Sequence, residues 1–153
     1  MKTFHIPSIT CLLLCCLALI ACSSTQVVED TPYSEPQVSS DTPQNPAVVA
    51  LRAEADRQLA AGNLQLAANA LERGIRIAPR DPRLRQQLAE VRLRQGDYVQ
   101  AKSLARMAVV YGRGRPDVQA DAWDVIGRAE TEMGNLREAD LAFEEARSLR
   151  DQW

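Results

Sequence analysis

Cysteine and histidine, the side chains that most often act as nucleophiles, general bases and metal ligands, occur only within the first 22 of the 153 residues. The histidine is His5, and the cysteines are Cys11, Cys15, Cys16 and Cys22. After Cys22 the chain therefore lacks the residues for Cys–His or Ser–His catalysis and for the usual zinc ligand sets. The first three cysteines lie in an apolar run without polar partners, so their spacing does not indicate a metal site. We expect no enzymatic activity and no cofactor.

Two further patterns could carry chemistry, but each is better explained as part of a helical domain. The carboxylate pairs Glu130/Glu132 and Glu144/Glu145 fall on predicted helices, so we expect them to point outward on solvated faces. The stretch GRGRP at 112–116 has two glycines and two arginines, but it lacks the strand–loop–helix context of a phosphate-binding loop. It predicts a loop between helices.

The first 21 residues have the pattern of a secretory signal peptide. Lys2 precedes an apolar run from Ile9 to Ala21, which is shorter than the ~20 residues that cross a bilayer core. The end of this run, LIAC at 19–22, resembles the lipobox of bacterial lipoproteins, in which the cysteine thiol is acylated and the chain is cleaved just before it. An ordinary signal peptide or a short anchor with an incidental cysteine is the alternative.

The lipobox resemblance implies a mature chain that begins at a lipidated Cys22. Cys22 would carry a diacylglyceryl thioether and an N-acyl chain. These three acyl chains would bind a membrane far more firmly than a single chain, which gives only marginal binding. Ser23 and Ser24 follow in place of the aspartate that would suggest retention in the inner membrane. We therefore expect the inner leaflet of the outer membrane, with the rest of the chain in the periplasm.

Residues 22–46 are predicted to be the lipidated cysteine and a disordered linker. Residues 23–46 contain four prolines and four acids but no basic residue, a composition that cannot bury enough apolar surface to offset its ordering entropy. As a coil such a linker would span about 25–30 Å, and up to ~80 Å if extended. It would let a domain reach away from a membrane.

From Ala47 onward the chain repeats itself. The segments AAGNLQLAANALERGIRIAP (60–79), RQGDYVQAKSLARMAVVYGR (94–113) and EMGNLREADLAFEEARSLRD (132–151) each have Gly, then Asn or Asp, an apolar residue, and Ala three positions later. The repeated glycines are Gly62, Gly96 and Gly134, which gives intervals of 34 and 38 residues. The residues of GRGRP account for the longer interval.

A period of 34 residues with this pattern resembles the tetratricopeptide repeat. The third copy carries it most fully, with Trp123, Ile126, Gly127, Gly134, Asn135, Leu136, Ala139, Phe143 and Ala146. The resemblance implies an all-α fold, an α-solenoid of three helix-turn-helix repeats at about 48–81, 82–115 and 120–153, in a domain spanning 47–153. Each Gly-Asn or Gly-Asp pair should end a first helix, and Pro79 and Pro82 should separate repeats 1 and 2.

Small residues support close helix packing, whereas some large charged residues depart from the family pattern. Ala55, Ala67, Ala89 and Ala101 allow two helices to approach closely. Arg85 and Arg92 stand where the family usually has large apolar or aromatic side chains, and Glu54 replaces a usual Leu. Either the arginine stems are buried along apolar surface, or repeat 2 is loose. Its core should rest on Leu84, Leu88, Val91 and Leu93.

The C-terminal end, ARSLRDQW, follows the third repeat without an obvious polar capping helix. An uncapped repeat leaves apolar surface exposed, which stacked repeats normally avoid. One interpretation is a contact for a second copy or a partner around Trp153. The other is a frayed, solvated tail.

Charge is distributed unevenly over residues 47–153, which hold 17 basic and 16 acidic residues. Seven arginines lie between 73 and 94, with Glu72, Asp81 and Glu90 among or beside them, whereas residues 117–146 hold nine acids and two arginines. Salt bridges between repeats are one interpretation, and a polarised groove that orients a partner is the other. The low pI of 5.5 and the acids beside the arginine cluster argue against nucleic acid.

In tetratricopeptide domains the first helix of each repeat lines the concave face, where peptides or partner helices commonly bind. Transferred position by position, the resemblance implies eight partner-binding residues: Arg52, Asp56, Arg83, Gln86, Glu90, Arg94, Asp124 and Arg128.

Together these features predict an outer-membrane lipoprotein that presents a protein-interaction scaffold to a periplasmic or inner-membrane partner. The layout resembles small tetratricopeptide lipoproteins that activate bifunctional penicillin-binding proteins in peptidoglycan synthesis. The alternatives are a pilus or secretin assembly lipoprotein, whose relatives carry about twice as many repeats, an adaptor for a periplasmic protease, and a self-assembling structural protein.

Overall fold

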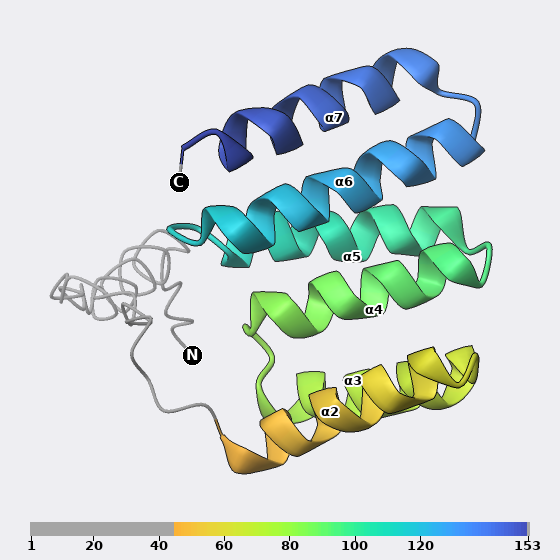
Figure 1. Cartoon of the computed structure of the whole chain (residues 1–153), viewed down its shortest axis with the longest axis vertical. Coiled ribbons are helices and arrows are strands. Elements are labelled where there is room, and N and C mark those ends of the chain that lie inside the picture. Colours follow the sequence, from red (N-terminus) through yellow and green to blue (C-terminus); the bar gives the residue numbers. More distant parts are fainter. Residues whose placement is uncertain (1–44, 153) are drawn as a thin grey trace, which may run out of the picture. The chain divides into compact units, whose positions relative to one another are not determined.

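The structure, a computed structural model, describes residues 45–152. This part of the chain consists of six helices joined in pairs (Figure 1). The helices are α2 (Pro46–Ala60), α3 (Leu64–Ile77), α4 (Pro82–Arg94), α5 (Tyr98–Tyr111), α6 (Pro116–Glu132) and α7 (Leu136–Arg150). The predicted signal peptide, lipobox and linker up to residue 44, and Trp153, lie outside the described residues.

Turn and cap residues explain where the helices begin and end. Gly62, Gly96 and Gly134 have φ angles of 77°, 80° and 80°, and each lies in the turn between the two helices of a pair. This left-handed conformation costs a glycine nothing, which confirms the predicted turns. Pro82 opens α4, and the Asp81 carboxylate caps that helix by accepting a hydrogen bond from the Arg83 backbone N–H at 2.9 Å.

The pairs stack on one another to form the predicted all-α solenoid of tetratricopeptide type. Helices α2, α4 and α6 lie in one layer at the front of Figure 1, with α3 and α5 behind them. Helix α4 packs directly on α6, while α3 contacts α4 and α5 contacts α6. The GRGRP stretch is the predicted loop, since α5 ends at Tyr111 and α6 begins at Pro116.

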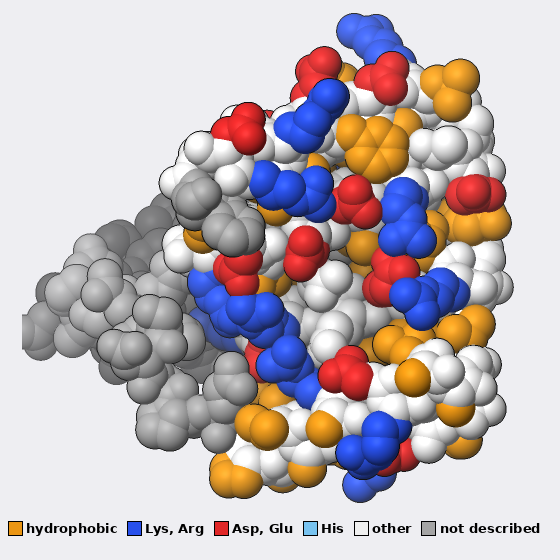
Figure 2. Space-filling model, viewed as in Figure 1, with side chains coloured by type: hydrophobic (Ala, Val, Ile, Leu, Met, Phe, Trp, Pro, Cys, Tyr) orange, Lys and Arg blue, Asp and Glu red, His pale blue; other side chains and the backbone are white. Residues whose placement is uncertain are grey.

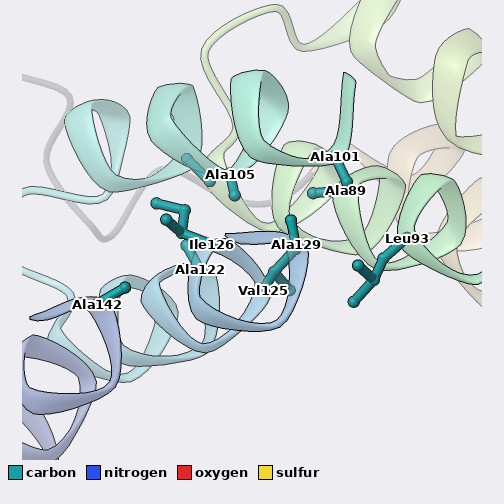
Figure 3. Packing of buried hydrophobic residues seen from close by; sticks show 10 residues of the cluster. Ala89, Leu93, Ala101, Ala105, Ala122, Val125, Ile126, Ala129 and Ala142 are labelled. Carbon is teal, nitrogen blue, oxygen red and sulfur yellow. The ribbon is translucent and has the colours of Figure 1, made fainter. Parts of the chain in front are cut away.

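Alanine dominates the buried contacts between helices. Ala55, Ala67, Ala89 and Ala101 are fully buried, as their spacing predicted. In the core between α4, α5 and α6, small side chains alternate with Leu93, Val125 and Ile126 (Figure 3). Because a methyl group is the only bulk at most of these positions, the helices approach closely and the few larger side chains fill the remaining space.

The second repeat is tightly packed, and its two unusual arginines are partly buried. Leu84, Leu88, Val91 and Leu93 are all buried, as expected. The Arg85 guanidinium lies 4.7 Å from the centre of the Tyr111 ring, and Arg92 pairs with Glu72 at 2.5 Å. The first interpretation of these arginines, buried stems in a closed core, is therefore the one observed.

One prediction about carboxylates is wrong. Glu130 does not point to solvent but is 3% exposed, because it accepts hydrogen bonds from Asn135 at 2.8 Å and pairs with Lys102 at 3.1 Å. These two partners from the neighbouring turn and from α5 compensate its buried charge. Glu132, Glu144 and Glu145 are exposed, as predicted.

Helix α7 ends the described domain with a mainly charged outer surface. Its buried side consists of Ala139, Ala142 and Ala146, and its exposed large apolar residues are Leu136 and Leu141.

Within residues 45–152, no helix is long and apolar enough to cross a membrane.

Candidate interaction site

The eight predicted partner-binding residues lie on α2, α4 and α6, the three helices that form one face of the domain. Arg52 and Asp56 are on α2, four residues are on α4, and Asp124 and Arg128 are on α6. Figure 2 shows basic and acidic side chains interleaved across this face rather than segregated into one block. The structure therefore brings the predicted residues onto a common surface, and their role in binding a partner stays a prediction.

The first two repeats are joined across this face by Gln87, which is not among the eight predicted residues. Arg52 donates from Nε to the Gln87 side-chain oxygen at 3.1 Å, and the Gln87 amide donates to Asp56 at 3.2 Å. Gln86, the predicted neighbour, is half-buried. The α2–α4 contact is thus a bridged hydrogen-bond network.

The second and third repeats are joined by ion pairs. Glu90 accepts from Arg94 Nε at 3.0 Å on its own helix and from Arg128 Nη1 at 2.7 Å on α6. Arg83 pairs with Asp117 at the start of α6. Salt bridges between repeats, the first interpretation of the uneven charge, are therefore present. Asp124 on α6 also lies 4.0 Å from Arg128 Nη1, so the charges of Arg94 and Arg128 are balanced by carboxylates of the same face.

Two carboxylates on α6, those of Asp121 and Asp124, lie near an arginine of α7. Arg150 Nη2 lies 3.9 Å from both Asp121 and Asp124. Partial burial raises the pKa of Asp121, the Arg150 guanidinium opposes that shift, and the neighbouring carboxylates Asp117 and Asp124 add to it. No group of three or more His, Cys, Asp or Glu side chains in residues 45–152 is arranged to hold a metal ion.

A pocket of about 390 Å³ opens where four helices meet. It is lined by Leu93, Arg94, Tyr98, Arg128, Thr131, Glu132 and Phe143, from the end of α4, the start of α5, the last turns of α6 and the middle of α7. Arg94 and Arg128 were predicted site residues. Leu93, Tyr98 and Phe143 were predicted as core or repeat residues and Glu132 as solvated surface, whereas Thr131 was not predicted to have a role. The pocket therefore combines apolar and aromatic side chains with two guanidinium groups and the Glu132 carboxylate.

Two contacts between residues on neighbouring helices affect the shape and the electrostatics of the pocket. A Cβ on Gly127 would lie 2.5 Å from Phe143 Cε1, so the absence of a side chain there lets the ring lie against α6. The Glu132 carboxylate next to Tyr98 raises the pKa of the phenol, and desolvation acts in the same direction. The sequence marked Tyr98 and Phe143 as repeat residues, so it gave no signal of a pocket.

Comparison with known proteins agrees with the observed architecture. Residues 58–120 match the tetratricopeptide repeat family. The globular C-terminal domain of LpoP from P. aeruginosa is 41% identical with a TM-score of 0.66, over 69% of this chain and 99% of that domain. Curated protein sequences gave no match.

More distant structures share the fold alone. The first tetratricopeptide domain of Spaghetti (RPAP3), solved with the HSP90 peptide SRMEEVD, is 21% identical with a TM-score of 0.63, over 68% of this chain and 79% of that one. The N-terminal domain of stress-induced protein-1 from C. elegans is 18% identical with a TM-score of 0.62, over 68% and 84%. The identity and coverage of the LpoP match show that this chain belongs to the family of the LpoP globular domain, built from tetratricopeptide repeats.

Proposed function

We propose that the protein is a lipoprotein of the outer membrane that faces the periplasm and activates a bifunctional penicillin-binding protein in peptidoglycan synthesis. Cys22 would carry the lipid, residues 23–46 would form the tether, and the repeat domain would bind the synthase. The domain acts as a scaffold and performs no reaction itself in this proposal, so activation has to come from binding.

The observation that carries the proposal is the match to a whole domain. The chain aligns with 99% of the LpoP globular domain, at 41% identity. A domain of this size suits the small tetratricopeptide lipoproteins that the layout resembles, whereas pilus-assembly relatives carry about twice as many repeats. A signal peptide, a lipobox and a linker ahead of the domain are what such an activator needs to reach inward from the outer membrane.

The pocket between α4, α5, α6 and α7 is the part of the surface best suited to hold a partner segment. Leu93, Tyr98 and Phe143 offer apolar surface for one side chain. Arg94 donates to Glu90 through Nε and Arg128 through Nη1, so the other N–H groups of the two guanidiniums could bind a carboxylate of the partner at the rim. A partner segment with an apolar side chain beside an acidic one fits this arrangement.

The direct test measures glycan polymerisation and peptide cross-linking by a purified bifunctional synthase from the same organism, with and without this protein. The wild-type chain should raise one or both rates. Failure to stimulate, together with capture of a secretin or a protease from crosslinked envelopes, would refute the proposed activity.

Charge reversal tests the site separately from the activity. The variant Arg94→Glu/Arg128→Glu should lose at least about tenfold in apparent affinity for the synthase, because two rim contacts become repulsive. The matched control Arg73→Glu/Arg137→Glu changes the charge equally at exposed positions on α3 and α7 and should stimulate like the wild type. Equal loss in both variants would mean that overall charge, and not this pocket, governs binding.

Anchoring is tested at Cys22. A Cys22→Ala chain should leave the membrane fraction and lose the mass of the acyl chains. A variant that still partitions with membranes would contradict the lipid anchor.

A further inference from the structure

A second charged surface lies at one end of the domain, away from the pocket. It consists of residues 76–85 and 111–117, which we name the basic edge, and it holds six arginines and two aspartates. Both segments are connections from the second helix of one repeat to the first helix of the next. Figure 1 shows the two connections at the same end of the stack, the end at which α2 begins.

The two connections are in contact, so their arginines form one surface. A Cβ on Gly112 would lie 3.6 Å from the Cβ of Pro82, and the Arg85 guanidinium lies 4.7 Å from the centre of the Tyr111 ring. Arg80 is two residues before Pro82, and Arg113 directly follows Gly112. The two positive segments therefore meet at the start of α4 and the end of α5.

Most of this positive charge has no partner among the described residues. Arg76, Arg80, Arg113 and Arg115 form no ion pair within residues 45–152, whereas Arg83 is neutralised by Asp117. The other acid of the basic edge, Asp81, is engaged as the cap of α4. Below the surface, Arg85 Nη1 is buried without a hydrogen-bond partner, and the guanidinium lies over the Tyr111 ring instead of a carboxylate.

Exposed apolar side chains are interspersed with these arginines. Ile77, the last residue of α3, is 45% exposed, and Val110 and Tyr111, at the end of α5, are 55% and 40% exposed. Cationic heads beside aliphatic and tyrosine side chains suit the interface of a bilayer, where the charges meet headgroups and the apolar parts meet the acyl boundary. A flat acidic protein surface would satisfy the arginines but leave the apolar side chains in water.

We infer that the basic edge binds the headgroups of an anionic phospholipid surface. The position of α2 supports this occupant, because the proposed tether from the lipidated Cys22 joins the domain at the same end. The binding is weak and salt-sensitive, so it is reversible and compatible with a domain that leaves the membrane to reach a synthase. The pocket lies at the opposite ends of α4 and α6 and stays accessible when the basic edge is bound.

The test uses the chain from residue 22 onward carrying Cys22→Ser, so that acyl chains do not mask the contribution of the domain. Co-sedimentation is measured with vesicles of about 70% phosphatidylcholine and 30% phosphatidylglycerol, whose anionic lipid gives a negative surface potential. Vesicles of pure phosphatidylcholine are the uncharged comparison. Binding should be seen with the anionic vesicles only, and should fall as NaCl rises to 0.5 M because screening shortens the reach of the charges.

Two quadruple variants with the same change of charge decide whether the basic edge is responsible. Each arginine near an anionic surface contributes about fivefold to partitioning, so Arg76, Arg80, Arg113 and Arg115 changed to Gln should reduce it about 100-fold or more. The control changes Arg57, Arg94, Arg128 and Arg137 to Gln, all near the opposite ends of their helices, and should bind like the parent. Circular dichroism checks that both variants are folded.

Three outcomes would overturn the inference. Equal binding to both kinds of vesicle would exclude recognition of anionic lipid, and equal loss in the two variants would assign it to overall charge. Binding to poly-glutamate that exceeds binding to the anionic vesicles would make the basic edge a docking surface for acidic protein. Each result is independent of synthase stimulation, so neither proposal depends on the test of the other.

Discussion

The contact between Gly127 and Phe143 predicts that Gly127→Ala lowers the free energy of unfolding in the wild type but raises it when Phe143 is replaced by Ala. In the wild type, Gly127→Ala would place a Cβ 2.5 Å from Cε1, 2.7 Å from Cδ1 and 2.8 Å from Cζ of the Phe143 ring. Real Cβ atoms do not approach so closely, so the ring must move away from α6. The same ring lines the pocket, so the substitution also alters the candidate site.

Two opposing free energies set the magnitude. Replacing a helical Gly by Ala stabilises a helix by about 1 kcal/mol, while overpacking typically costs about 1–3 kcal/mol. We therefore expect Gly127→Ala to lower the free energy of unfolding by about 1 kcal/mol. Phe143→Ala alone should lower it by about 2 kcal/mol, since the side chain is only half-buried. In the Phe143→Ala background the clash is gone, and Gly127→Ala should then stabilise by about 0.5–1 kcal/mol.

Urea unfolding followed by circular dichroism measures all four members of this cycle, which should give a coupling of about 2 kcal/mol. Leu141→Ala, on the exposed side of α7, is the matched control background, in which Gly127→Ala should remain destabilising. If Gly127→Ala has the same effect with and without the Phe143 ring, the two residues do not touch and the packing of α7 on α6 is not as described.

Three further predictions concern single residues. Glu130→Gln should lower the free energy of unfolding by about 1–3 kcal/mol at neutral pH, because it leaves Lys102 without its buried carboxylate. Burial raises the pKa of Glu130, but the hydrogen bonds from Asn135 and Lys102 outweigh it, so the pKa is lowered. The stability that this carboxylate contributes is present above pH 4.5 and is lost as the pH falls through its lowered pKa. The urea unfolding of the variant should therefore depend less on pH in that range. Gly134→Ala should cost about 1–2 kcal/mol in thermal unfolding through its φ of 80° alone, since a Cβ would meet nothing within 4 Å, and an unchanged melting temperature would contradict the left-handed turn. Asp121→Asn should be neutral or slightly stabilising at pH 7, because burial raises the pKa of the acid and disfavours its charged form. The difference from the wild type should shrink as the pH falls through that raised pKa and be gone below the ordinary value of 3.8. A clearly destabilised variant would show that the pairing with Arg150 dominates instead.

Several parts of the fold were predictable because local chemistry fixes them. The Gly-Asn and Gly-Asp pairs are predicted turns, and their glycines have the positive φ that such turns require. The four alanines chosen for close packing are fully buried, since in each repeat a small residue at a fixed position meets the neighbouring helix. A period of 34 residues was enough to identify the repeats and to place the first helices on one face.

The contacts across that face were less predictable, although a signal for them existed. Arg83 pairs with Asp117 and Arg128 with Glu90 at separations of 34 and 38 residues, and Arg52 meets Gln87 at 35. These separations are close to the repeat period, so adding one period to each charged position would have suggested the partners. The repeat period does not predict the partners of Glu130, because Lys102 and Asn135 do not lie one period away from it.

The sequence by itself determined the class of fold, the positions of the turns and the face that the first helices share, because periodicity, glycine and proline act within one repeat. Only the tertiary structure decided which arginines form ion pairs within residues 45–152, since an ion pair depends on how neighbouring repeats stack. The pocket was likewise beyond the sequence, because four helices contribute to it and the close approach of Phe143 to Gly127 shapes one of its walls.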